Sequence, residues 1–320
     1  MRRAALLSLA TTALLAGANA GGGAQTTSVV VPLHLEHSRY REPYLGIDVT
    51  LGSVTKRLEV DTASPGLRIL ASAVPAESFG SSGYSATVDY GNGLSLRGKV
   101  VLAPLGIGGI RSEHAVQVES VESVACASWF PKCSAANGGT PDEFGRLFPG
   151  VAGLMMTGAT PDACCVNPLY DLAGRVGRAY VLHADFSKPA LTLNPDAATI
   201  GKFSIVPVAL GVSSWPEGCI VVKDVQLNVC GQIVIDTGLQ DTVIQDPSPA
   251  LQTNFPGGTI ASLSVGAWKH AFTSGGQGDD RYTIFSRRGD RKRIILGLGA
   301  LQDVDVYFDL ERGRIGFRAL

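Results

Sequence analysis

The sequence predicts an all-β protein built from two similar halves. Its 39 glycines and 17 prolines are interspersed with short runs of Val, Ile, Leu and Thr, and long stretches with helical periodicity are scarce. The length of 320 residues favours two domains, and 45% hydrophobic with 17% charged residues is typical of a chain that buries substantial cores. The net charge of −1 offers no electrostatic basis for binding nucleic acid or an anionic membrane.

The first residues carry the three parts of a secretory signal peptide, which we assign to residues 1–20. Arg2 and Arg3 supply positive charge, residues 4–18 are apolar, and Ala18-Asn19-Ala20 is a small-x-small cleavage site. A membrane anchor is the alternative, but the apolar stretch is short for a spanning helix and no second one follows. We therefore expect export to a secreted or periplasmic location, with no membrane span after the signal is removed.

The first half, residues 26–195, shows a pattern of strand, turn and strand. A pair of β-rich runs at 44–50 and 56–60 comes first. Two further runs flank Gly91-Asn92-Gly93, and Asn-Gly between such runs is the strongest short signal of a hairpin. Residues 126–149, rich in Gly, Pro, Ser and Asn, are then expected to form a long surface loop clamped by cysteines.

The second half, residues 196–320, repeats this order after a crossing segment at 180–209. In chain order it contains a hairpin at 219–229, a strand and turn at 234–236, and a closing pair of strands at 304–310 and 313–317. Such a weak internal repeat is the pattern expected of a duplicated lobe.

The chain has six cysteines, which in an oxidising compartment allow three disulfides. They are Cys126, Cys133, Cys164, Cys165, Cys219 and Cys230. Cys219 and Cys230 bracket the predicted hairpin of the second half, so we pair these two first, and the pairing of the other four stays open. A metal site is a poorer explanation because the spacings lack paired Cys-x-x-Cys units.

Two similar tripeptides provide the main chemical signal, Asp61-Thr62-Ala63 in the first half and Asp236-Thr237-Gly238 in the second. Each follows a β-branched and apolar run, so each aspartate is expected where a strand ends and a tight turn begins. An apolar-apolar-Gly sequence follows each one downstream, at Val151-Ala152-Gly153 and Ile295-Leu296-Gly297. One such aspartate alone is an ordinary turn former, but the recurrence indicates two carboxylates presented to a single water.

Other constellations compete with this pair. The five histidines allow a Ser-His-Asp triad, whose members need not be adjacent, although no Gly-x-Ser-x-Gly elbow accompanies them. His34 and His37 could ligate a metal, but an exposed strand edge explains this segment better. The basic run at 287–293 contains Arg-Gly-Asp. It has two explanations, a solvated hairpin tip or an adhesive or polyanion-binding site. Gly297-Leu298-Gly299 lacks a βαβ context and indicates a turn.

Taken together, these residues resemble those of a pepsin-like aspartic protease, in order across most of the mature chain. The resemblance makes Asp61 and Asp236 the catalytic dyad. The family's dyad-supporting positions match Thr62, Ser64, Thr237 and Gly238, and its substrate-covering flap matches Tyr90, Gly91 and Asn92. Its lobe-closing segments match residues 148–154, 295–297, 308–309 and 314–317, and residues 61–68 resemble a bacterial branch of the fold.

The resemblance implies a bilobal fold, with two β-barrel-like lobes around a central cleft, at residues 26–195 and 196–320. It implies a secreted, monomeric aspartic endopeptidase that hydrolyses polypeptide substrates and needs neither a metal nor an organic cofactor. In that mechanism two close carboxylates share one proton, so that one acts as base on a water while the other donates to the scissile carbonyl. The alternative is a pepsin-like binding or inhibitor-like module that lacks turnover.

Three residues depart from the family pattern. Ala63 replaces a glycine, and its methyl group is expected to crowd a loop where two backbones approach closely. Leu239 replaces a Ser or Thr, so Asp236 should lack one hydrogen-bond donor and hold the shared proton more often than Asp61. Arg68 replaces a tryptophan that contacts the flap tyrosine, which predicts a more polar first subsite.

Overall fold

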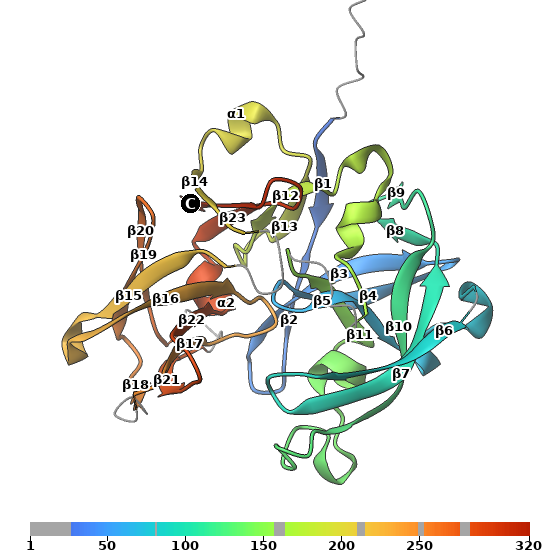
Figure 1. Ribbon diagram of the computed structural model, residues 1–320, viewed down its shortest axis with the longest axis horizontal. Helices are drawn as coiled ribbons and strands as arrows, with labels where there is room; N and C mark the ends of the chain where they lie inside the picture. Colours follow the sequence, from blue (N-terminus) through green and yellow to red (C-terminus); the bar gives the residue numbers. More distant parts are fainter. Residues whose placement is uncertain (1–26, 81, 157–163, 210–214, 249–252, 276–281) are drawn as a thin grey trace, which may run out of the picture.

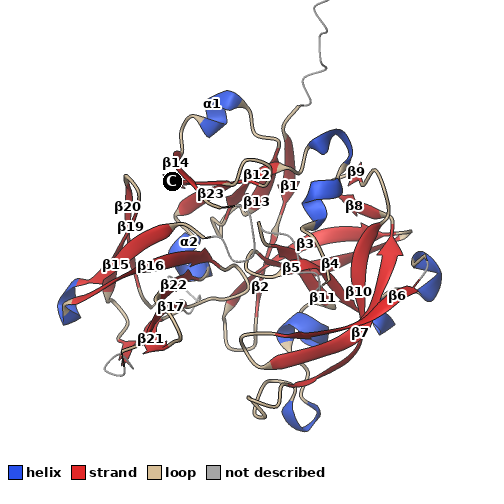
Figure 2. Cartoon of the chain, viewed as in Figure 1, coloured by secondary structure: helices blue, strands red, loops and turns tan. Residues whose placement is uncertain are grey.

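The computed structural model describes residues 27–80, 82–156, 164–209, 215–248, 253–275 and 282–320. Its regular structure is almost entirely strand, as the sequence predicts, and the strands form three sheets (Figure 1 and Figure 2). The predicted signal peptide, residues 1–20, lies outside the described residues. Within the described ranges, no helix combines the length and apolarity needed to cross a membrane.

The sheet that carries Asp61 has ten strands, in the order β6-β7-β10-β5-β11-β4-β3-β8-β9, with β2 paired to β3. Their bounds are β2 (His34–His37), β3 (Pro43–Leu51), β4 (Val54–Asp61), β5 (Pro65–Leu70), β6 (Ser82–Asp89), β7 (Leu94–Ala103), β8 (Leu105–Ile107), β9 (Ile110–Arg111), β10 (Val116–Cys126) and β11 (Gly150–Leu154). The turn between β6 and β7 contains Gly93 at φ +86°, a conformation that favours glycine. The predicted Asn-Gly hairpin is therefore confirmed.

The sheet that precedes and follows Asp236 has eight strands, in the order β18-β21-β17-β22-β16-β15-β19-β20. Their bounds are β15 (Glu217–Val222), β16 (Leu227–Ile235), β17 (Thr242–Asp246), β18 (Thr253–Phe255), β19 (Ile260–Val265), β20 (Trp268–Thr273), β21 (Ile284–Arg288) and β22 (Arg293–Leu296). Strands β21 and β22 flank β17 and do not pair with each other. The basic run at 287–293 thus joins two separated strands, and its description as a hairpin tip is wrong.

The third sheet has six strands, in the order β1-β13-β12-β23-β24-β14. It consists of β1 (Val29–Pro32), β12 (Ala179–His183), β13 (Ala190–Leu193), β14 (Ser204–Pro207), β23 (Val304–Asp309) and β24 (Arg314–Ala319). In Figure 1 it occupies the upper middle of the view. At its centre Tyr180 of β12 stacks on Phe308 of β23 with ring centroids 4.9 Å apart, and both side chains are fully buried. The predicted crossing segment and the predicted closing strands therefore share one sheet with a buried centre.

Among the residues that the structure describes, helical structure is limited to short turns. They are the α-helical turns α1 (Ala197–Ile200) and α2 (Leu298–Leu301), the 3-10 turns η1 (Ala71–Ala73), η2 (Ala76–Ser78), η3 (Ala136–Gly138), η5 (Pro168–Asp171), η6 (Ala173–Arg175) and η7 (Lys223–Val225), and the π turn η4 (Asp142–Arg146). Two of them, η3 and η4, fall in the predicted surface loop at 126–149.

The two larger sheets repeat one plan. Eight strands of the first sheet correspond, in chain order, to strands β15 to β22 of the second. They are β3, β4, β5, β7, β8, β9, β10 and β11, and corresponding strands have the same neighbours in the two sheets. Parallel pairing of β4 with β11 corresponds to parallel pairing of β16 with β22. Strand β6 has no counterpart among the described strands of the second sheet, and it completes the hairpin at residues 90–93. The internal repeat predicted from the sequence therefore corresponds to a repeated sheet.

Disulfides join cysteines that lie near one another along the chain. Cys219 and Cys230 face each other across β15 and β16 and form the disulfide that the sequence predicts. The sequence leaves the pairing of the other four cysteines open. In the structure Cys126 pairs with Cys133, and Cys164 pairs with Cys165. Three disulfides suggest an oxidising or extracellular compartment.

Candidate active site

Asp61 and Asp236 occupy equivalent places in the two repeated sheets. Asp61 is the last residue of β4, and Asp236 directly follows β16. The last four residues of β4 and the whole of the neighbouring strand β11 are buried, so the first aspartate lies at the buried end of its strand. Each carboxyl group thus belongs to a loop that a sheet holds in place.

Two glycines explain why an apolar-apolar-Gly sequence accompanies each aspartate. A Cβ atom on Gly153 of β11 would lie 2.5 Å from the carbonyl oxygen of Ser64. A Cβ atom on Gly297, which follows β22, would lie 2.6 Å from the carbonyl oxygen of Leu239. Because only glycine permits such close approach, each strand passes directly against the loop that carries the carboxyl group.

Reciprocal hydrogen bonds between Thr62 and Thr237 tie the two loops together. The Thr62 hydroxyl donates to the carbonyl oxygen of Ile235 (2.7 Å) and accepts from the backbone N–H of Thr237 (3.2 Å). The Thr237 hydroxyl donates to the carbonyl oxygen of Val60 (2.6 Å) and accepts from the backbone N–H of Thr62 (3.1 Å). Both threonines are fully buried. Since each hydroxyl donates and accepts across the junction, the loops are held in one arrangement.

The Asp61 carboxyl group packs directly against the second loop. A Cβ atom on Gly238 would lie 2.9 Å from Cγ of Asp61, so a larger residue at this position would displace the carboxyl group. Asp61 Oδ1 accepts from the backbone N–H of Ala63 (2.8 Å) and of Ser64 (3.1 Å). Asp236 Oδ1 accepts from the backbone N–H of Gly238 (3.1 Å). Ala63 therefore keeps the donor that the family's glycine would supply.

The two carboxyl groups differ in their electrostatic surroundings. Burial raises the pKa of Asp61, and the donors of Ser64 and Ala63 partly offset this rise. Burial raises the pKa of Asp236 well above its ordinary value, and the negative charge of Asp61 raises it further. Asp236 has the higher pKa of the pair, in the direction expected from Leu239, which adds no side-chain donor. The two groups suit a shared proton held mainly on Asp236.

The tip of the β6-β7 hairpin reaches the first aspartate. Tyr90 and Asn92 line one small cavity together with Asp61, whereas a Cβ atom on Gly91 would meet no neighbour within 4 Å. The Tyr90 ring packs edge-on against Phe144, with ring centroids 6.2 Å apart. Asn92 Nδ2 donates to Glu143 Oε1 (2.9 Å), so a hydrogen bond joins the hairpin tip to η4.

Arg68 does not line this cavity, which corrects the expectation that it makes the first subsite polar. Its side chain is 1% exposed and donates from Nε to Glu119 Oε2 (3.0 Å). Further bonds run to the carbonyl oxygens of Pro65 and Cys164. The guanidinium lies 5.8 Å from the centroid of the Tyr90 ring, so it supports the hairpin tip by a cation–π contact.

Glu59 and Glu143, which the sequence patterns do not single out, make the cavity acidic. The cavity has a volume of about 30 Å³ and is lined by Glu59, Asp61, Tyr90, Asn92, Leu94, Glu143, Phe144, Val151 and Gly238. Glu59 is 1% exposed, and neither carboxyl oxygen has a hydrogen-bond partner among the described residues. The sequence does carry a signal for Glu59, which lies between two apolar residues in the run Leu58-Glu59-Val60. A glutamate is rarely buried unless it is paired.

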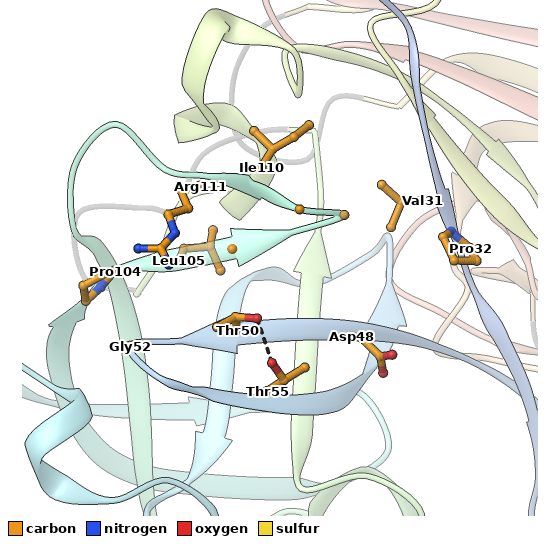
Figure 3. Close-up of a pocket in the computed structure, with 13 residues that line it drawn as sticks. Val31, Pro32, Asp48, Thr50, Gly52, Thr55, Pro104, Leu105, Ile110 and Arg111 are labelled. Atoms are coloured by element: carbon orange, nitrogen blue, oxygen red, sulfur yellow. Dashed lines mark hydrogen bonds between the residues drawn. The ribbon is translucent and has the colours of Figure 1, made fainter.

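A second hollow, larger than the cavity beside Asp61, is lined by neither Asp61 nor Asp236. It has a volume of about 460 Å³ and is lined by residues of β1, β3, β4, β8 and β9 (Figure 3). The hydroxyls of Thr50 and Thr55 are hydrogen-bonded to each other on its floor (2.8 Å). Its walls hold no buried polar group without a partner among the described residues, so it offers no comparable chemistry.

A hydroxyl, an imidazole and a carboxylate do lie in line on the third sheet. His183 Nε2 lies 2.8 Å from Thr192 Oγ1, and His183 Nδ1 lies 2.7 Å from Asp305 Oδ1. Asp305 also accepts two hydrogen bonds from the Arg318 guanidinium, which neutralises the charge that would stabilise an imidazolium. We interpret this line as a structural network that joins three strands.

The alternative sites at the histidines and the basic run find no support. His34 Nε2 lies 3.3 Å from Asp48 Oδ2, and the Arg57 guanidinium contacts both side chains. No group of three potential metal ligands occurs in the described part of the chain. In the basic run Lys292 pairs with Asp246 (3.7 Å), across the turn from the adjacent strand.

Fold and site together define a class: an all-β protein with the pepsin-like fold and an aspartate loop in each repeated sheet. Its structure is similar to the crystal structure of an aspartic proteinase from Irpex lacteus, with a TM-score of 0.60 and 12% sequence identity. The match covers 92% of this chain and 97% of that one. At this identity the likeness establishes the fold, and it gives no support to a bacterial branch. No protein-family model and no curated protein matches the sequence.

Proposed function

We propose that this protein is a secreted aspartic endopeptidase, which hydrolyses polypeptides by a water activated between Asp61 and Asp236. The observation that carries the proposal is the reciprocal bonding of Thr62 and Thr237, which ties together two loops that each carry an aspartate. A structural role for either aspartate alone would not require the two loops to meet. The three disulfides support an exported location.

The two aspartates are suited to different roles. Asp61 accepts two backbone hydrogen bonds, which favour its charged form and suit it to act as base on the water. Asp236 has the more strongly raised pKa, which suits it to hold the proton and donate it to the scissile carbonyl. Tyr90 and Asn92 would cover the bound peptide and exclude bulk water. Monomeric action remains a prediction.

A second candidate is a peptide-binding module without turnover. Leu239 is the observation that favours it, because Asp236 accepts from the backbone of Gly238 with no hydroxyl at position 239 to assist. The same cleft and the same loops would then hold a peptide without activating a water.

Incubation of the purified mature protein with a mixed peptide library across acidic pH separates these two functions. We expect cleavage products, and we expect a statine peptide, which mimics the tetrahedral transition state, to suppress them. Absence of cleavage at every pH, together with tight binding of the statine peptide, would establish the binding module. If the protein neither cleaves peptides nor binds the statine peptide, both proposed functions are wrong.

Restoring a hydroxyl with Leu239→Thr should move the alkaline limb of the pH–rate profile to lower pH. The active form carries one shared proton, so activity falls as pH rises through the raised pKa of Asp236. A new donor favours the charged form and lowers that pKa. One hydrogen bond to a charged group contributes about 1.5–3 kcal/mol, which corresponds to roughly 1–2 pH units. Leu239→Val is the matched control, and an unmoved limb in Leu239→Thr would contradict the expectation.

A further inference from the structure

The cavity beside Asp61 contains a carboxyl group that the dyad does not use. Glu59 lies two residues before Asp61 on β4 and faces Val151 of β11 in the sheet register. Its side chain is buried, and both oxygens lack a hydrogen-bond partner among the described residues. Burying a carboxyl group without a partner is costly, and unpaired groups of this kind in native proteins require an explanation.

The surroundings of Glu59 favour a cation as its partner, because a positive charge would stabilise its ionised form beside other carboxyl groups. Burial raises the pKa of Glu59, and the negative charges of Glu143, Asp61 and Asp236 raise it further. Arg68, the buried cation near the hairpin tip, is already held by Glu119. The cavity therefore concentrates acidic groups without a compensating positive charge of its own.

The size and walls of the cavity favour an organic cation on a flexible chain. A cavity needs about 10–15 Å³ to hold one water, so its volume of about 30 Å³ admits two or three atoms of that size, such as an ammonium group and the methylene before it. Leu94, Phe144 and Val151 supply apolar walls along which a methylene chain can pack, as lysine stems do. A metal ion is a poorer fit, since no three potential ligand side chains cluster in the described residues.

Two residues that line the cavity, Asn92 and Glu143, are joined by an exposed hydrogen bond. Asn92 Nδ2 donates to Glu143 Oε1 at an exposed position, so release of the hairpin tip would free a second carboxylate for the incoming group. Glu143 and Glu59 would then face the ligand from η4 and β4.

We propose that this cavity receives the ammonium group of a lysine side chain that adjoins the scissile peptide bond, with Glu59 as its principal partner. The inference rests on the proposed peptidase function and names the substrate class. It commits to lysine because a planar guanidinium is larger than the cavity.

Binding of uncleavable peptides tests this proposal separately from turnover. Statine peptides would carry lysine, norleucine or arginine in turn at the residue on either side of the statine, since norleucine has the length of lysine without its charge. By titration calorimetry we expect the lysine peptide to bind about tenfold more tightly than the norleucine peptide at one of the two positions. Glu59→Gln should abolish that preference. Glu122→Gln, at an exposed position of β10, is the matched control and should keep it.

Each outcome decides the proposal. Equal binding of lysine and norleucine by the unsubstituted protein, binding of neither, or equal binding of arginine would overturn it, and this comparison does not depend on the folding of any variant. A lysine preference that survives Glu59→Gln would also overturn it. Norleucine binding as tight as lysine binding, together with cleavage, would leave the peptidase function standing and reject the subsite. Lysine-selective binding without cleavage would support the subsite and reject the peptidase function.

Discussion

Replacing Asp61 with asparagine should lower kcat/KM for peptide cleavage by about 10²–10⁴-fold, the range expected when a general base is removed. An amide cannot take a proton from water, so the base is lost. The fold should persist, because the amide oxygen can still accept from the backbone N–H groups of Ala63 and Ser64. Steady-state kinetics with one cleaved peptide, together with the free energy of unfolding, provide the measurement. Asp236→Asn should have an effect of similar size.

Asp48→Asn is the matched control for this change. Asp48 lies on the neighbouring strand β3, is exposed, and pairs with Arg57 at 3.0 Å. Its loss should leave kcat/KM unchanged, since exposed ion pairs contribute about 0–1 kcal/mol to stability and Asp48 does not line the cavity beside Asp61. Cleavage at an undiminished rate by Asp61→Asn would show that the reaction occurs elsewhere in the molecule.

Replacing Thr62 with valine should lower the free energy of unfolding by about 2–5 kcal/mol. Valine keeps the shape of threonine, so the packing is preserved while the hydroxyl is lost. The carbonyl oxygen of Ile235 and the backbone N–H of Thr237 would then be buried without a partner, and each such group costs about 1–3 kcal/mol. Because the two aspartate loops would no longer be tied together, cleavage should fall as well.

Denaturant unfolding of Thr62→Val, Thr237→Val and the double variant measures this junction. The double variant should lose less than the sum of the single losses, because both hydroxyls act at one contact. Thr55→Val provides the control: its hydroxyl is bonded to Thr50 at an exposed position, and its loss should change stability by less than about 0.5 kcal/mol. A loss below about 1 kcal/mol in Thr62→Val would show that the threonine bonds do not hold the two sheets together.

Several features were predictable because they depend on residues close together in the chain. Asn92-Gly93 predicts its hairpin through turn geometry alone. Cys219 and Cys230 could be paired because they bracket one hairpin, and the structure confirms the pair. The all-β class follows from composition and short β-rich runs, and the structure and its similarity to an aspartic proteinase bear it out.

The environment of each site residue required the tertiary structure. Sequence patterns indicate that a side chain is buried, but sheet order and register decide what it meets. Arg68 was expected to line a subsite, yet the parallel register of β5 with β10 places it opposite Glu119, 51 positions farther along the chain.

The two aspartate loops and the turns that shape them could be predicted from the sequence, since they depend on local backbone geometry. The bonds of Thr62 and Thr237, 175 positions apart, to each other's loop became visible only in the folded chain. So did the enclosure of Glu59 without a hydrogen-bond partner among the described residues. A hydrogen bond or an unpaired carboxyl group depends on distances between segments, and the pairing of distant strands sets those distances.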